Sequence, residues 1–281
     1  MSVPTAVACE KVEGTRLRAA QPTPSLDQKI VFLSSPTEFH MADEWYALAV
    51  ADHFWFQWRF RAIREILRGD RLQEPILEVG CGNGTAREQI EQYYGYRVDG
   101  CDVNWAALRK APPGRGTLYF YDIHQRRPEW KGYFKAVILL DTLEHIPDPE
   151  RFLRSVSYHL APQGQLLINV PALQWLYSRY DEIAGHIRRY DVAALRDQLN
   201  AAGFSVIRHA YWGLTLLPVA VVRKWLVNTS RPADIIRLGF QPGSKLADRF
   251  LRGLMHLERF LCTRAPLGTS LVALSQKVGR A

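Results

Sequence analysis

Pro75-Ile-Leu-Glu-Val-Gly-Cys-Gly-Asn-Gly84 combines a short apolar run with three closely spaced glycines. Residues 76–79 have the composition of a short buried strand, and the three glycines at alternate positions after it predict a tight turn. Residues 85–90, Thr-Ala-Arg-Glu-Gln-Ile, predict the start of a helix. Glycine permits positive φ and has no Cβ, so a ligand can lie against the turn while the first N–H groups of the helix point at it. The stretch therefore predicts a nucleotide-sized binding site near residue 80.

The spacing of the glycines does not fit the dinucleotide-binding fingerprint, Gly-x-Gly-x-x-Gly. Counted from Gly80, the last glycine would fall on Thr85, and counted from Gly82 it would fall on Arg87. Residues 78–84 have instead the pattern Glu-x-Gly-x-Gly-x-Gly. A different nucleoside ligand is therefore expected.

The composition predicts one globular domain with an insertion. The chain has 281 residues, of which 47% are hydrophobic and 23% charged, which is enough for one large core with an appendage. Its four cysteines, Cys9, Cys81, Cys101 and Cys262, include no Cys-x-x-Cys pair, so neither a disulfide framework nor a metal site is indicated. The sequence shows no signal-peptide pattern and no run of 18 apolar residues. We expect a cytoplasmic protein, or one held peripherally at the inner face of the membrane.

The positive charge is concentrated near the C-terminus. Residues 1–200 contain 24 Lys+Arg and 25 Asp+Glu, whereas residues 201–281 contain 12 Lys+Arg and 3 Asp+Glu. The whole net charge of +8 thus comes from the last part of the chain. Its arginines alternate with Leu, Val, Trp and Phe. A surface that binds along a nucleic-acid strand would instead combine them with Gly, Ser and aromatic residues that stack on bases, so nucleic acid is not the expected partner.

The N-terminal part is predicted to contain a tail and a helical cover. Residues 1–42 have no apolar period and are expected to be largely disordered. Residues 43–70 carry apolar side chains at helical spacing, with Asp43 as the N-cap and Gly69 as the stop. They form one helix, or two that are broken near His53. The aromatic segment 53–59 either packs on the nucleotide-binding domain or covers an acceptor pocket.

Three predicted strands each end in an aspartate. The strand at 96–101 is followed by Asp102, the strand at 117–121 by Asp122, and the strand at 134–140 by Asp141. Open α/β sheets place their binding sites at the carboxyl ends of parallel strands, and a carboxylate there can accept both hydroxyl hydrogens of a ribose. The three aspartates therefore predict a ligand-binding rim.

Further strands are predicted at 166–170, 204–211 and 268–276, and helices lie between most of the strands. This alternation predicts the α/β class with a mostly parallel sheet. The nucleotide-binding domain is expected to span residues 71–211 and 267–281. Residues 212–266 would then be an insertion between the last two strands.

Several of these segments together resemble the class I S-adenosylmethionine-dependent methyltransferases. The matching segments are the glycine turn, Asp102, Tyr121-Asp122, Leu140-Asp-Thr-Leu-Glu-His-Ile-Pro-Asp148, Leu160-Ala-Pro-Gln-Gly-Gln-Leu-Leu-Ile168, and Gly185-His-Ile-Arg-Arg-Tyr190 before Ala202-Gly-Phe204. The resemblance covers residues 45–211 and 266–277. Within the family the chain looks like the small-molecule branch that includes ubiquinone-biosynthesis-like and glycan-cluster enzymes. Enzymes of the family that methylate amino groups of DNA carry an Asn-Pro-Pro-Tyr-type motif after the fourth strand. This chain has no such motif there, which argues against a nucleobase acceptor.

The resemblance implies a Rossmann-like sheet of seven strands flanked by helices, with the last strand antiparallel. It also implies bound S-adenosylmethionine, with Glu78 and the glycines near its methionine end, Asp102 on the ribose and Asp122 near the adenine amine. The residues that it assigns to the cofactor are Glu78, Gly80, Cys81, Gly82, Gly84, Asp102, Val103, Asp122, Ile123, Asp141 and Thr142.

The expected activity is O-methylation of a small molecule or glycan. The sulfonium of the cofactor is already activated, so the protein must align the acceptor and exclude water, and a base is needed only if the acceptor loses a proton. The candidates for that base are His145 and His186. His145 either serves as the base or caps the turn at Pro147. A second group either binds the acceptor or braces its own loop: Tyr177, Tyr180, His186, Arg188 and Arg189. The two arginines would suit an acidic, phosphorylated or glycan acceptor.

The insertion at 212–266 leaves two structural alternatives open. It is either an extra helical pair that covers the sheet or forms a homodimer, or a basic apolar foot that rests on an anionic membrane. In the second case the enzyme would act on a lipid or lipid-linked acceptor. A cofactor-binding module without activity is a third alternative for the whole chain.

Overall fold

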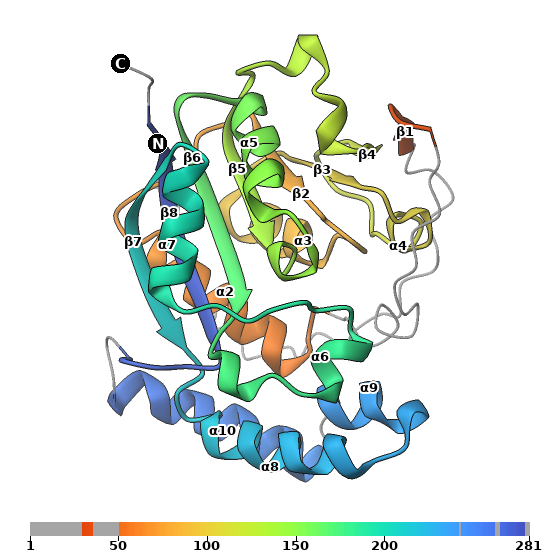
Figure 1. Ribbon diagram of the computed structural model, residues 1–281, viewed down its shortest axis with the longest axis vertical. Helices are drawn as coiled ribbons and strands as arrows, with labels where there is room; N and C mark the ends of the chain where they lie inside the picture. Colours follow the sequence, from red (N-terminus) through yellow and green to blue (C-terminus); the bar gives the residue numbers. More distant parts are fainter. Residues whose placement is uncertain (1–29, 36–50, 242, 262–264, 279–281) are drawn as a thin grey trace, which may run out of the picture.

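The computed structural model describes residues 30–35, 51–241, 243–261 and 265–278. These residues form one sheet of eight strands in the order β1-β4-β3-β2-β5-β6-β8-β7 (Figure 1). The strands are β1 Ile30–Phe32, β2 Ile76–Val79, β3 Val98–Asp102, β4 Leu118–Phe120, β5 Phe134–Leu140, β6 Leu160–Pro171, β7 Phe204–Trp212 and β8 Ser270–Lys277. All neighbours pair in parallel except β8, which is antiparallel to both β6 and β7.

The expected mostly parallel sheet with its last strand antiparallel is confirmed, but the strand count of seven is wrong by one. Residues 30–32 fall within the predicted tail, yet they pair in parallel with β4 at the edge of the sheet. The amides of Leu33 and Ser34 donate to the carbonyl of Phe120, and the Ser34 hydroxyl accepts from the amide of Asp122. Three apolar residues are too few to show a strand period, so only these pairings reveal the strand.

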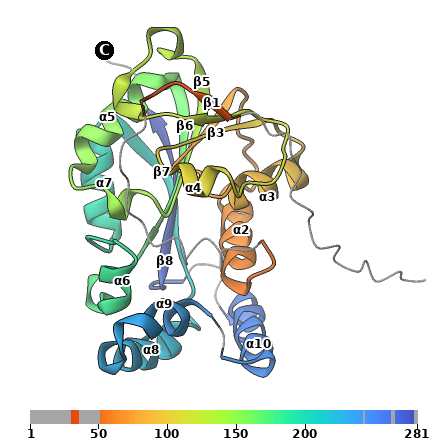
Figure 2. The ribbon, with the colours of Figure 1, turned by 90° about the vertical axis from the view of Figure 1, so that its right-hand side faces the viewer.

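Helices cover both faces of the sheet (Figure 2). On one face, α2 (Phe54–Ile66) and α3 (Thr85–Tyr94) pack their apolar side chains on β2, β5 and β8. On the other face, α5 (Pro149–His159) and α7 (Val192–Ala201) pack against β5, β6 and the antiparallel strands. The remaining short helices are α4 Trp105–Leu108, α6 Arg179–Ile183 and four 3-10 turns at Ile123–Gln125, Pro128–Trp130, Leu143–His145 and Gln174–Leu176. The sheet is therefore buried on both sides, as its nearly continuous apolar strands require.

The predicted N-terminal helix is present from Phe54 onward. His53 caps it, because its Nδ1 accepts from the amide of Trp55. The predicted cap Asp43 lies outside the described residues. The helix ends at Ile66, so Gly69, with φ of +86°, follows it in the turn beyond.

The described residues of the insertion form three helices rather than the expected pair. They are α8 (Leu217–Thr229), α9 (Pro232–Phe240) and α10 (Lys245–Leu261), and the Ser244 hydroxyl accepts from the amide of Ala247 at the start of α10. Because β7 and β8 are antiparallel, the segment that joins them must lie at the carboxyl edge of the parallel strands. Figures 1 and 2 show the three helices at that edge, with α10 against α2, and α8 and α9 against α6. In the described part of the chain, no helix is long and apolar enough to cross a bilayer.

Candidate functional site

A cavity of about 340 Å³ opens at the carboxyl ends of β2, β3, β4 and β5. The three aspartates that follow the predicted strands, Asp102, Asp122 and Asp141, all line it. Other predicted cofactor residues that line this first cavity are Glu78, Gly80, Cys81, Gly82, Val103, Ile123 and Thr142. Gly84 is not among its lining residues. The structure thus brings ten of the eleven predicted cofactor residues together.

The glycine turn has the backbone shape that its sequence predicts. The φ angles of Gly80, Gly82 and Gly84 are +73°, +52° and +73°. Residues that have a Cβ adopt such positive values only with strain. A Cβ on Gly80 would also lie 2.5 Å from Oγ1 of Thr142. Gly84 serves instead as the N-cap of α3, where a Cβ would meet Ala111 at 3.0 Å.

Asp102 fixes the shape of this turn from the next strand. Its Oδ2 accepts from the amide of Gly82 at 2.7 Å, and its Oδ1 accepts from the amide of Asn104 at 2.7 Å. Burial raises the pKa of this carboxyl group. The amide of Val103 contributes a further hydrogen bond to the carboxylate, which can accept about four in all. Asp102 therefore braces the glycine turn in addition to any contact with a ribose, a task that the sequence did not reveal.

Glu78 supplies an unpartnered acceptor to the first cavity. Its side chain is 2% exposed, and its Oε2 has no hydrogen-bond partner among the described residues. Burial raises the pKa of Glu78 to about 7, against the opposing effect of Arg59 and Arg87. A buried carboxylate oxygen without a partner is costly, so this site suits a cationic group of a ligand.

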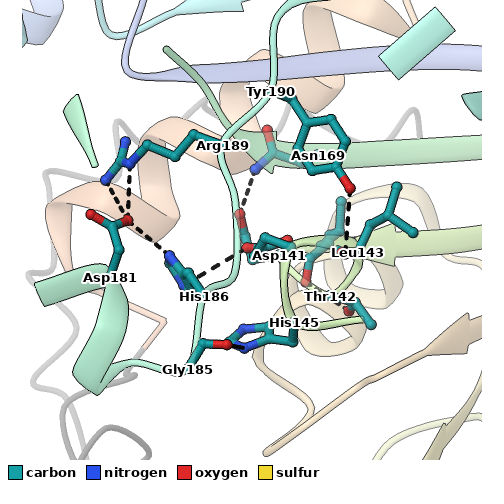
Figure 3. Close-up of polar contacts among 12 residues, drawn as sticks. Asp141, Thr142, Leu143, His145, Asn169, Asp181, Gly185, His186, Arg189 and Tyr190 are labelled. Atoms are coloured by element: carbon teal, nitrogen blue, oxygen red, sulfur yellow. Dashed lines mark hydrogen bonds and ion pairs between the residues drawn. The ribbon is translucent and has the colours of Figure 1, made fainter. Parts of the chain in front are cut away.

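A buried network ties the N-terminal helix to the rim. The guanidinium of Arg59 donates to Oδ2 of Asp141 at 2.6 Å, and Nδ2 of Asn169 donates to Oδ1 at 2.7 Å. Figure 3 shows Asn169 and Asp141 facing one another across neighbouring strands. Asp141 has φ of +54°, a left-handed conformation that is uncommon outside glycine, and these contacts hold it in place. Arg59 could not be predicted as a site residue from the sequence, because 82 positions separate it from its partner.

A second cavity of about 360 Å³ adjoins the first and is built largely by the insertion. The two cavities share Asp141 and His186. Most of the side chains that line the second cavity are apolar, among them Trp55, Leu216, Val222, Leu226, Phe240 and Phe250. Segment 53–59 contributes to both cavities, which supports the interpretation that its aromatic end covers a pocket.

The two candidate catalytic histidines lie together where the cavities meet (Figure 3). Their rings are 4.8 Å apart at an interplanar angle of 79°. Nδ1 of His145 is 3.0 Å from the carbonyl oxygen of Gly185, so His145 does not cap the turn at Pro147 by this atom. Nδ1 of His186 is 3.0 Å from Oδ1 of Asp181. Burial, together with the neighbouring His186, lowers the pKa of His145 to about 4.

The other predicted acceptor residues divide into two groups. Tyr180 and Arg189 line the second cavity, whereas Tyr177 and Arg188 are not among the residues that line either cavity. The hydroxyl of Tyr177 donates to the carbonyl of His186, and Arg188 donates to the carbonyl of Pro147. These contacts favour the alternative in which Tyr177 and Arg188 brace their own loop rather than bind the acceptor.

The expectation that both arginines attract an acidic acceptor is not supported. Arg189 is buried and pairs with Asp181 at 2.7 Å, so its charge is already balanced. A cation that sequence reasoning missed, Arg223 of α8, lines the second cavity and lies 5.1 Å from the ring centre of Tyr180. Its position could not be foreseen, because the path of the insertion was unknown.

Comparisons with known proteins agree with this geometry. The family model described as a methyltransferase domain matches residues 53–209. The ubiquinone biosynthesis O-methyltransferase of Proteus mirabilis is 26% identical over 161 residues, which make up 51% of this chain and 64% of that protein. The corresponding enzyme of Pseudomonas paraeruginosa is 33% identical over 102 residues, or 34% of this chain and 44% of that protein. The matches thus span less than two thirds of the length of these relatives.

Two solved structures share the fold. A putative methyltransferase of Haloferax volcanii, solved with a methyltransferase activator, has a TM-score of 0.56 at 16% identity over 86% of this chain and 100% of its own. A putative methyltransferase of Bacillus halodurans has a TM-score of 0.51 at 14% identity over 78% of this chain and 100% of its own.

The first cavity fits S-adenosylmethionine. The unpartnered Oε2 of Glu78 suits the ammonium of its methionine part, and the missing Cβ of Gly80 lets Thr142, another residue that lines the cavity, pack against the glycine turn. The family match covers more than half of the chain. The chain belongs to the methyltransferase domain family, the class I S-adenosylmethionine-dependent methyltransferases that its glycine turn resembles.

Proposed function

We propose that this chain transfers a methyl group from S-adenosylmethionine to a hydroxyl of a small, largely apolar molecule. The observation that carries this proposal is the pair of adjoining cavities, which share Asp141 and His186. One cavity has the glycine turn and the aspartate rim, and the other has an apolar lining. Such an arrangement lets a cofactor and an acceptor meet end to end for an in-line displacement.

The residues of the chain position the reactants and exclude water. The cofactor supplies an activated methyl group, so alignment is the main task left to the protein. Nδ1 of each histidine faces an acceptor oxygen, so the neutral form of each ring places its proton there and its lone pair on Nε2. These lone pairs lie where the cavities meet, so the acceptor hydroxyl is expected to face them.

The lining of the second cavity favours an apolar acceptor over a glycan. Glycan recognition needs many hydrogen-bonding side chains, and most of the side chains here are hydrocarbon or aromatic. The O-methyltransferase activity of the curated relatives supports a hydroxyl acceptor.

The proposal is tested by binding first and turnover second. Calorimetry should show binding of S-adenosylhomocysteine and none of NAD. Methyl transfer should then be measured on a panel of hydroxylated acceptors with graded apolar size. His186→Ala should lower turnover and leave cofactor affinity nearly intact, whereas Arg188→Ala, outside both cavities, should change neither. Parallel loss of cofactor binding and turnover in His186→Ala would contradict the division into two cavities.

A second candidate is a lipid or lipid-linked acceptor reached at a membrane surface. The observation that favours it is that Val222, Leu226 and Phe250 line the second cavity and are also exposed to solvent. Exposed apolar side chains beside basic residues can rest on an anionic bilayer.

Vesicle pelleting tests this candidate. We expect binding to anionic but not neutral vesicles, weakened by salt and by Trp225→Asp on α8. The matched control is Tyr133→Asp, which also changes an exposed aromatic residue but precedes β5 at the opposite edge of the sheet. No pelleting, or equal loss in both variants, would exclude the membrane candidate.

A further inference from the structure

Three side chains that can bind a metal ion converge where the two cavities meet. Glu144 and His145 belong to the turn after β5, and His186 follows α6. One potential ligand atom from each lies within 4.8 Å of the other two. The amide of Ile187 donates to the carbonyl of Glu144 at 2.9 Å and so holds the two segments together.

Glu144 is a buried carboxylate without a hydrogen-bond partner in the described part of the chain. It is 0% exposed, and neither of its oxygens has a hydrogen-bond partner among the described residues. Two nearby carboxylates, Asp141 and Asp181, each have an arginine at 2.6–2.7 Å. The charge of an ionised Glu144 is thus left without the cation that its neighbours have, and a buried unpaired charge is strongly unfavourable.

The histidines are oriented as metal-binding histidines are. A metal-bound imidazole donates its other N–H to a carbonyl or a carboxylate, which fixes its tautomer. Nδ1 of His145 faces the carbonyl of Gly185, and Nδ1 of His186 faces the carboxylate of Asp181. Both Nε2 lone pairs are therefore available, and Nε2 of His186 lies 4.0 Å from Oε1 of Glu144.

We propose that Glu144, His145 and His186 bind one divalent transition-metal ion of the Zn²⁺ type at the junction of the two cavities. Two imidazole nitrogens and one carboxylate form a donor set suited to such ions, and three protein ligands leave a coordination position open. Bond lengths of about 2.0–2.2 Å place an ion between His186 and Glu144 after the ligands draw in by less than about 1 Å. The spacing of cysteines gave no sign of this site, because no cysteine contributes to it.

The ion would also assist the methyl transfer; this role of the ion rests on the proposed function. At the open position, a Lewis acid lowers the pKa of an acceptor hydroxyl that reaches it. The two imidazoles would then hold the ion instead of removing the proton.

The alternative is a protonated Glu144 that donates to Nε2 of His186. This needs only a shortening of the 4.0 Å separation to hydrogen-bond length. It predicts no metal binding, so the two arrangements can be told apart.

The test is metal binding by the full, tag-free chain after treatment with a chelator. Calorimetry with Zn²⁺ alone, without cofactor or acceptor, should give one ion per chain, and Co²⁺ should give the absorption spectrum of a bound ion. Glu144→Gln and His145→Gln should each weaken binding by about 100-fold or more, since loss of an outer partner alone costs about 10–100-fold. His209→Gln is the matched control, because His209 is an exposed histidine on β7.

Thermal unfolding separates a lost ligand from a damaged fold. Zn²⁺ should raise the Tm of the unchanged chain and of His209→Gln. Glu144→Gln should have at least the Tm of the metal-free chain, because it removes a buried ionisable group, and should not respond to Zn²⁺. Absence of stoichiometric binding of Zn²⁺ and Co²⁺, or binding that Glu144→Gln and His145→Gln leave unchanged, would overturn the metal site. Failure to bind S-adenosylhomocysteine would instead contradict the proposed function.

Discussion

The pH dependence of cofactor binding is a direct test of Glu78. In the free protein, burial raises the pKa of this carboxyl from 4.5 to about 7. Below pH 7 it is therefore mostly protonated, and a protonated carboxyl cannot pair with the ammonium of S-adenosylmethionine. Affinity for the cofactor should thus be highest above pH 7 and should fall as the pH drops.

The size of the effect follows from the ionised fraction. With a pKa of about 7, roughly 3% of the molecules carry ionised Glu78 at pH 5.5 and roughly three quarters at pH 7.5. If the ammonium holds Glu78 ionised in the complex, affinity at pH 5.5 should be about 25-fold weaker than at pH 7.5, or about 2 kcal/mol. If the ammonium returned the pKa of Glu78 in full from about 7 to 4.5, the ion pair would contribute about 3.4 kcal/mol. This is more than the 25-fold difference in affinity requires.

Calorimetry with S-adenosylhomocysteine, which keeps the ammonium, measures this slope from pH 5.5 to 7.5. Glu78→Gln should bind weakly at every pH, with little slope. The matched control is Glu88→Gln on α3, which makes the same chemical change at a residue that does not line the first cavity. It should keep the slope of the unchanged protein.

Two results would refute this reasoning. One is an affinity that does not change between pH 5.5 and 7.5. The other is a slope in Glu78→Gln as steep as that of the unchanged protein, which would point to another titrating group such as Asp102, whose pKa burial also raises.

Three further predictions concern the fold around the site. Arg59→Met should lower the free energy of unfolding by about 3–5 kcal/mol, because it leaves Asp141 buried without its cation, and an unchanged urea midpoint would contradict this. Gly80→Ala should weaken S-adenosylhomocysteine binding far more than Gly95→Ala, since both residues have positive φ but a Cβ on Gly95 meets only the Arg115 side chain at 3.6 Å; equal affinities in calorimetry would argue against it. Burial lowers the pKa of His53 from its ordinary 6.5 to about 4, so protonation of His53 should destabilise the fold as the pH falls from 6.5 to 4. If His53→Gln shows the same dependence of stability on pH in urea unfolding as the unchanged protein, this prediction is wrong.

The sequence determined those parts of the structure whose causes are local. The glycine turn and the helix after it follow from backbone freedom at Gly80, Gly82 and Gly84. The apolar runs before Asp102 and Asp141 place each aspartate at the end of a strand, and parallel pairing then brings the aspartates to one edge. The antiparallel pairing of the last two strands then places the insertion at that edge as well, although the path of its helices does not follow from the sequence.

Only the tertiary structure decided which distant side chains meet. The edge strand at Ile30–Phe32 exists because β4 offers it a pairing partner, and its three residues carry no period of their own. Arg59 reaches Asp141 from a helix 82 positions away, and Glu144 meets His186 where contacts between two separate segments, Ile187 to Glu144 and His145 to Gly185, join them. The periodicity of a sequence shows which face of a helix or strand is buried. The partner of a buried charged side chain depends instead on how separate elements pack, and the local sequence around the charged residue does not contain that information.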